Sequence, residues 1–135
     1  MQGLDISAKL ETFGEDLHPD VMVSLITNWI TALAMTNLVY LQLYPNTVPL
    51  YDSGVYYRQE KPGEEDFFDI PMVLRQGYAD CEDLAAWRVA EYLSVGQQAS
   101  PMVTYELYDN GDIDFHVRVL TAYGVEDPSR ILGMP

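Results

Sequence analysis

The chain contains one cysteine, Cys81, one histidine in its C-terminal half, His116, and an Asp-Pro pair that begins at Asp127. Cys81 stands where a helix is expected to begin, in the run Gly-Tyr-Ala-Asp-Cys-Glu-Asp-Leu. A thiolate is a nucleophile, an imidazole can take and return its proton, and a carboxylate can orient the imidazole. The order Cys, His, Asp therefore predicts acyl-transfer chemistry.

Three acidic neighbours make the ionisation of Cys81 depend on His116. A helix start favours a thiolate, and a neighbouring imidazolium can lower a cysteine pKa from about 8.5 to roughly 3.5 to 7.5. Asp80, Glu82 and Asp83 oppose this because like charges disfavour one another. We therefore expect His116 to lie close to the sulfur. A lone cysteine is ordinarily a small buried hydrophobe, but the polar flanks argue against that role here.

The periodicity after Asp80 predicts the helix that carries Cys81. Asp80 is a good N-cap, and Asp83 three residues later resembles a capping box with a shorter acid. The pattern ends near Gly96. The apolar residues that recur at helical spacing are Leu84, Trp87, Val89, Ala90 and Leu93.

A hairpin is expected to carry His116. Residues 103–108 and 113–121 flank Asp-Asn-Gly-Asp, a strong signal for a tight turn. Alternation puts His116 on the face opposite the apolar one. The apolar face holds Ile113, Phe115, Val117 and Val119, and the other holds Asp114, His116, Arg118 and Leu120.

A short third strand over residues 125–127 is expected beside the hairpin. Pro128 biases Asp127 toward an extended backbone. Its carboxylate could reach the imidazole nitrogen that the sulfur does not use and so fix the tautomer. Asp114 is the rival partner of His116. We favour Asp127 because cross-strand side chains approach more closely than residues two apart along one strand.

Residues 21–44 carry no charge over a length that could cross a bilayer. Polar residues interrupt the apolar ones at three- to four-residue spacing, which favours an amphipathic helix without membrane association. Pro19 and Pro45 mark its start and stop. It is either a core helix or a helix whose uncharged face another subunit covers. This face holds Ser24, Thr27, Asn28 and Thr31.

Residues 45–77 are rich in proline, glycine and aromatics, which predicts a long ordered loop with a short helix over 69–76 that ends at Gly77. The aromatic side chains either line a substrate groove or cap the core. They are Tyr51, Tyr56, Tyr57, Phe67 and Phe68.

Length and composition limit the classes of protein. We predict one domain over residues 1–135, with a helical extension (1–45) and a core (46–135). The formal charge of −14 argues against nucleic-acid binding. One cysteine and two separated histidines make no zinc site, so neither metal nor cofactor is expected. The lone cysteine and the N-terminal sequence argue against secretion and favour a reducing compartment or a particle assembled in one.

The chain resembles the transglutaminase-like branch of the papain-like cysteine fold. The resemblance covers roughly residues 48–134 and is carried by three segments: Asp-Cys-Glu-Asp-Leu-Ala-Ala-Trp-Arg-Val-Ala-Glu from Asp80, His-Val-Arg-Val from His116, and Glu-Asp-Pro-Ser-Arg-Ile-Leu-Gly-Met from Glu126. With Pro-Leu-Tyr-Asp-Ser-Gly-Val-Tyr-Tyr-Arg from Pro49, the chain is similar to small proteins of this type encoded by bacteriophages and prophages.

The resemblance implies an α+β fold and a cysteine hydrolase or acyltransferase that acts on protein or peptide-like amides. Cys81 would be the nucleophile, His116 the base and then the acid, and Asp127 the orienter. The Cys81 N–H, with Gln76 as a further candidate, would stabilise the oxyanion. Because a fold does not fix a function, the alternative is a non-catalytic virion structural or assembly protein whose partners are further copies or other virion proteins. A third reading is an acidic adaptor with an unreactive Cys81 far from His116.

Overall fold

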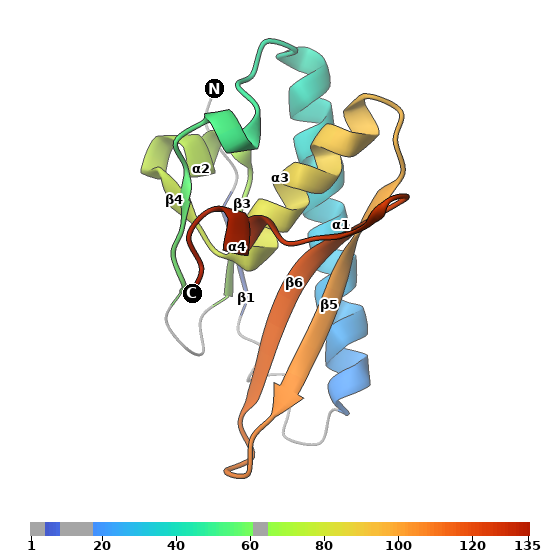
Figure 1. The fold of residues 1–135 in the computed structure, drawn as a ribbon, viewed down its shortest axis with the longest axis vertical. Coiled ribbons are helices and arrows are strands. Elements are labelled where there is room, and N and C mark those ends of the chain that lie inside the picture. The colour runs from blue at the N-terminus through green and yellow to red at the C-terminus, as the bar shows by residue number, and fades with distance from the viewer. Residues whose placement is uncertain (1–4, 9–17, 61–64) are drawn as a thin grey trace.

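The computed structural model describes residues 5–8, 18–60 and 65–135, which form an α+β fold in which two long helices pack against a three-stranded antiparallel sheet (Figure 1). The α+β prediction is thus confirmed. The elements in chain order are β1 (Asp5–Ala8), α1 (Pro19–Leu43), the 3-10 turn η2 (Leu50–Asp52), β2 (Tyr56–Tyr57), β3 (Glu65–Phe68), α2 (Ile70–Gln76), β4 (Tyr78–Ala79), α3 (Cys81–Ser94), β5 (Ala99–Leu107), β6 (Ile113–Thr121), β7 (Gly124–Glu126) and α4 (Pro128–Ile131).

The first long helix, α1, lies where the sequence predicts it. His18 caps its start by accepting a hydrogen bond from the Asp20 backbone N–H at 3.1 Å, and the helix ends two residues before Pro45. Ile26 and Ile30 are buried against α3 in one apolar cluster, so α1 shares the core that carries Cys81. By length and composition α1 could also cross a membrane, a test that core helices pass as well.

The sheet has the order β5-β6-β7 with all strands antiparallel, as the hairpin signal predicts. Val117 and Val119 of β6 are buried on the face toward α3, while His116 and Arg118 alternate with them and lie on the other face. The third strand, β7, is short and pairs with β6 only from Val119 onward, where it meets Glu126. The stretch of β6 around His116 therefore has β5 on one side and lies beyond the end of β7 on the other.

The segment expected to be one long loop is more regular than predicted. The helix α2 ends at Gly77, whose φ of 84° is a left-handed cap, as the sequence predicts. In addition, β3 pairs antiparallel with β1, and the two-residue β2 pairs parallel with β4. The loop prediction was wrong at these strands because each is very short and its partner lies elsewhere in the chain, so no local periodicity reveals it.

Candidate functional site

The start of α3 is built from three acidic side chains around Cys81. Asp80 is the N-cap, and the capping box with Asp83 is present. Asp83 accepts hydrogen bonds from the backbone N–H of Phe68 at 2.7 Å and of Asp80 at 3.4 Å. Asp80 in turn accepts from the Glu60 backbone N–H at 2.9 Å. These bonds tie the first turn of α3 to the segment that precedes α2.

Cys81 is buried, contrary to the sequence expectation. Its exposure is 8 %, and it belongs to the apolar cluster that contains Val117. The acidic neighbours did not indicate an exposed cysteine, because they are themselves buried. They are Asp80, Glu82 and Asp83. A polar first turn can fold inward when backbone N–H groups satisfy its carboxylates.

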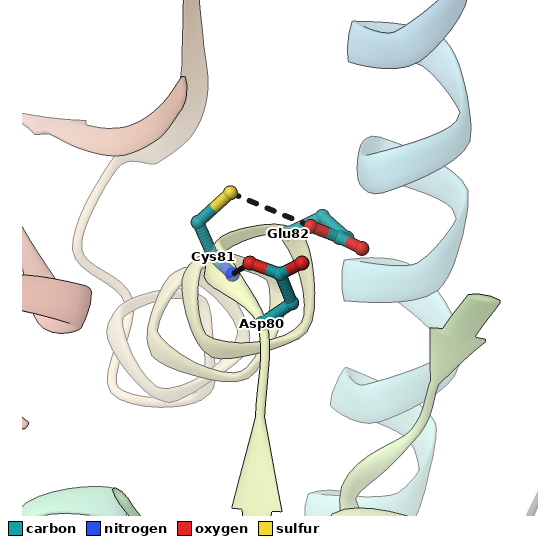
Figure 2. Close-up of side chains that lie close together, drawn as sticks. All are labelled: Asp80, Cys81 and Glu82. Carbon is teal, nitrogen blue, oxygen red and sulfur yellow. Dashed lines mark hydrogen bonds between the residues drawn. The ribbon is translucent and has the colours of Figure 1, made fainter. Parts of the chain in front are cut away.

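The thiol of Cys81 is held in its protonated form. Its Sγ donates to Glu82 Oε2 at 3.4 Å (Figure 2). Burial raises the pKa of the Cys81 thiol, and the charges of Glu82 and Asp80 raise it further. The backbone N–H of Val117 acts in the opposite direction because it favours the thiolate. Burial and the two acidic charges together outweigh the effect of this N–H on the pKa, so the sulfur is a thiol.

His116 and Asp127 form a direct contact. His116 Nε2 lies 2.9 Å from Asp127 Oδ2, so the structure pairs His116 with the acid that the sequence favours over Asp114. Because a carboxylate accepts, the ring proton sits on Nε2 and Nδ1 is left to face other groups. Asp127 lies one residue beyond β7, as the N-cap of α4, where it also accepts from the Arg130 backbone N–H at 3.4 Å.

The Cys81 sulfur lies beside the stretch of β6 that carries His116, and no hydrogen bond joins these two side chains. The sulfur meets the backbone N–H of Val117, which directly follows His116 in the chain. Within the described ranges, the one side-chain hydrogen bond of the sulfur goes to Glu82. The described contacts therefore hold the thiol on Glu82 and not on the imidazole.

The two donors expected to stabilise an oxyanion are engaged elsewhere. The backbone N–H of Cys81 donates to Asp80 Oδ1 at 2.7 Å (Figure 2). The side-chain amide of Gln76 donates to the Tyr78 carbonyl at 2.7 Å. The single N–H hydrogen of Cys81 is thus in use, and one of the two amide hydrogens of Gln76 is in use as well.

Two residues near the sulfur were not assigned a role from the sequence. Glu82 is the thiol's partner, although the sequence treats it only as a repulsive charge. Tyr57 packs on the cluster that contains Cys81. Burial raises the pKa of Tyr57, and so do Asp80, Cys81 and Glu82, so its hydroxyl stays a donor. The sequence pointed to Tyr57 only as one of the aromatic residues of the segment 45–77.

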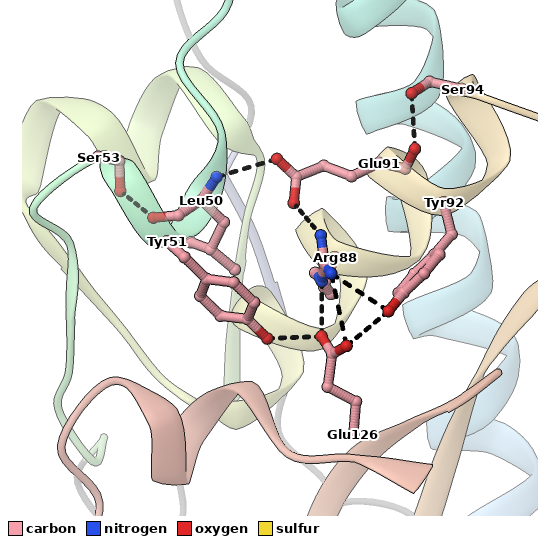
Figure 3. A network of polar contacts seen from close by, with 8 residues as sticks. All are labelled: Leu50, Tyr51, Ser53, Arg88, Glu91, Tyr92, Ser94 and Glu126. Carbon is pink, nitrogen blue, oxygen red and sulfur yellow. Dashed lines mark hydrogen bonds and ion pairs between the residues drawn. The ribbon is translucent and has the colours of Figure 1, made fainter. Parts of the chain in front are cut away.

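A polar network joins the end of β7 to α3. Glu126 accepts from Arg88 Nε at 2.5 Å, from Tyr51 at 2.5 Å and from Tyr92 at 2.6 Å (Figure 3). The Arg88 guanidinium carbon lies 4.8 Å from the Tyr51 ring centre and 4.4 Å from that of Tyr92. Glu91 completes the network by accepting from both Arg88 and the Leu50 backbone N–H. The helix that begins with Cys81 is thus fastened to the strand that precedes Asp127.

Acidic oxygens near the start of α3 are close enough to hold a cation. Two groups have ligand atoms within 4.8 Å of one another: Asp80, Cys81 and Glu82, and Glu60, Glu82 and Asp83. Several of these oxygens already accept backbone N–H groups, as described above for Asp80 and Asp83. A cavity of about 200 Å³ lies beside them, lined among others by Gln76 and Arg58.

Comparison of the chain with protein-family models, with curated proteins and with solved structures finds no match. The transglutaminase-like resemblance stays a prediction, and function is argued from the site itself.

Proposed function

We propose that this protein is a transglutaminase-like cysteine hydrolase or acyltransferase that acts on amide or peptide bonds through Cys81, His116 and Asp127. The observation that carries the proposal is the 2.9 Å contact between His116 Nε2 and Asp127 Oδ2, beside the strand position whose N–H meets the Cys81 sulfur. An α+β fold with a cysteine at a helix start and an imidazole on an antiparallel strand is compatible with a papain-like arrangement.

In the proposed reaction Cys81 transfers its proton to His116 Nδ1, and the sulfur attacks the substrate carbonyl carbon. The C–N bond then breaks as the imidazolium returns the proton to the leaving amine, which leaves a thioester on Cys81. Water or an amine attacks the thioester with His116 as base, and the thiol is regenerated. Asp127 keeps the ring in the tautomer that accepts at Nδ1.

The described geometry is the resting state of this cycle. Substrate must draw the thiol from Glu82 toward His116, and an oxyanion donor must become available. The Tyr57 hydroxyl, which packs near Cys81 and stays protonated, is the donor that we assign to this role.

A second candidate is a non-catalytic structural or assembly protein of a phage particle. It is favoured by the buried, protonated thiol of Cys81 and by the engaged N–H of that residue. The solvent-facing side of α1 also supports it, because Ser24, Asn28 and Thr31 are exposed there without any charged side chain between them.

The discriminating experiment is the pH dependence of iodoacetamide alkylation of Cys81, followed by intact mass. For an enzyme we expect reaction at pH 7 that His116→Ala slows by at least about tenfold, since a positioned base is worth 10² to 10⁴ in rate. Asp114→Ala, on the same face of β6, is the matched control and should react like the parent. Equally slow reaction in the parent and in His116→Ala would overturn the catalytic proposal and leave the structural one.

A further inference from the structure

The surroundings of Asp127 contain more positive than negative charge. Arg118 Nε lies 3.3 Å from Asp127 Oδ2, and Arg130 Nε lies 3.6 Å from the same oxygen. Two guanidiniums thus share one carboxylate, which leaves one net positive charge beside His116. Asp127 is the one carboxylate that pairs with either guanidinium in the described ranges. This surplus is unusual in a chain of formal charge −14.

Both guanidiniums are partly exposed and keep hydrogen-bond capacity beyond their contact with Asp127. The Asp127 contact is made through Nε in each case, and Arg118 Nη1 donates to Thr104 Oγ1 at 3.2 Å. The side chain of Arg118 is 30 % exposed and that of Arg130 59 %, against 14 % for Asp127. The terminal nitrogens can therefore reach a ligand while the Asp127 contacts persist. A guanidinium presents paired N–H groups that match a carboxylate.

We propose that Arg118 and Arg130 bind a carboxylate of the substrate, so that the scissile amide belongs to an acidic peptide-like molecule. The proposal rests on the proposed function. The surplus of one positive charge suits a singly charged carboxylate. Local arginines are needed for this because the field of so acidic a protein repels anions.

The position of Arg118 limits where that carboxylate lies. His116 and Arg118 are two residues apart on one face of β6, which is about 7 Å along a strand. One extended residue of a peptide spans about 3.5 Å. The carboxylate should therefore lie within about two residues of the amide that meets His116. The nearest acid on this face of β6, Asp114, is four residues or about 14 Å from Arg118.

The test uses a matched pair of small probes, N-acetylglycine with a carboxylate and N-acetylglycinamide without one. Binding is followed through the imidazole resonances of His116 by NMR at constant ionic strength. His18, exposed at the start of α1, is an internal control for unspecific ion effects. We expect N-acetylglycine to shift the His116 signals in a saturable way and N-acetylglycinamide to leave them unchanged.

Substitution assigns the effect to the two arginines. Arg118→Gln and Arg130→Gln should each weaken N-acetylglycine binding by at least about threefold, the scale of a solvent-exposed charge pair. Arg75→Gln, on the exposed side of α2, should change nothing. Equal shifts from both probes, or unchanged affinity in both variants, would overturn the proposal. The NMR readout does not depend on the thiol. If Cys81 proves unreactive while N-acetylglycine still binds, the catalytic proposal is overturned and carboxylate binding by the two arginines stands.

Discussion

The thiol of Cys81 donates to the carboxylate of Glu82 across 3.4 Å, between two residues that are adjacent in the chain and both buried. The pair keeps the proton on sulfur, because a carboxylate beside a buried thiol stabilises the neutral form. Glu82 therefore opposes the ionisation of the thiol, and the effect of removing its charge is measurable.

Glu82→Gln should make Cys81 more reactive. The amide preserves size and can still accept from the thiol, but it removes the negative charge that raises the thiol pKa. We expect iodoacetamide alkylation at pH 7 to become about three- to tenfold faster, which corresponds to a pKa decrease of up to about one unit. Glu106→Gln, on the exposed part of β5, is the control for the loss of one charge. An unchanged rate in Glu82→Gln would show that burial and Asp80, without Glu82, set the thiol pKa.

Asp127→Asn should separate the two tasks of Asp127. Asparagine is as good an N-cap as aspartate, so α4 should persist. The melting temperature should fall, because the ion pairs of Asp127 with Arg118 and Arg130 are lost. The charge that holds the His116 tautomer is lost, so the alkylation rate should fall by up to the loss expected for His116→Ala, which is at least about tenfold. Asp114→Asn should retain the rate. A wild-type rate in Asp127→Asn would remove Asp127 from the reaction centre.

Stability should fall as the pH rises, because of Asp83. Burial raises the pKa of this carboxyl above its ordinary value, which is about 3.9. At a pH between the ordinary pKa, which applies to the unfolded state, and the raised pKa of the folded state, the folded state binds more protons. The free energy of unfolding therefore decreases with increasing pH in this window. We expect a higher melting temperature near pH 5 than at pH 8.

Asp83→Asn should flatten this dependence by up to about 1.4 kcal/mol per pH unit within the window. Asp109→Asn, exposed at the hairpin turn, measures the contribution of net charge alone. Equal slopes in the parent and in Asp83→Asn would assign the dependence to other acids.

Arg88 and Glu126 should be energetically coupled. Both side chains are about four-fifths buried, with exposures of 23 % and 21 %. Removal of either partner leaves a partly desolvated charge, so Arg88→Gln and Glu126→Gln should each cost about 1 to 3 kcal/mol in urea unfolding. The double variant should be less destabilised than the sum by about 1 kcal/mol. Strict additivity would mean that the two side chains act independently.

Local patterns were sufficient for the regular elements that carry the site. Helical periodicity, the Asp80 cap and the Asn-Gly turn predicted α3 and β6 close to their observed bounds. The partner strand β5 begins at Ala99, four residues before the predicted start. The contact of His116 with Asp127 was also predicted, although Asp127 lies one residue beyond β7 as the N-cap of α4 and not within the third strand as expected. These signals act over a few residues and need no knowledge of the remaining chain.

The burial of Cys81 was decided by the tertiary structure. From the sequence, its first turn is polar. Only the folded chain shows that the backbone N–H groups of Glu60 and Phe68 satisfy the carboxylates of Asp80 and Asp83 in the interior. Likewise, Glu126 reaches Arg88 across 38 positions and Tyr51 across 75. The sequence by itself determined which groups could do chemistry and on which elements they lie. Whether the thiol is ionised or reachable depends on desolvation and on charges brought from distant segments, which only the folded chain sets.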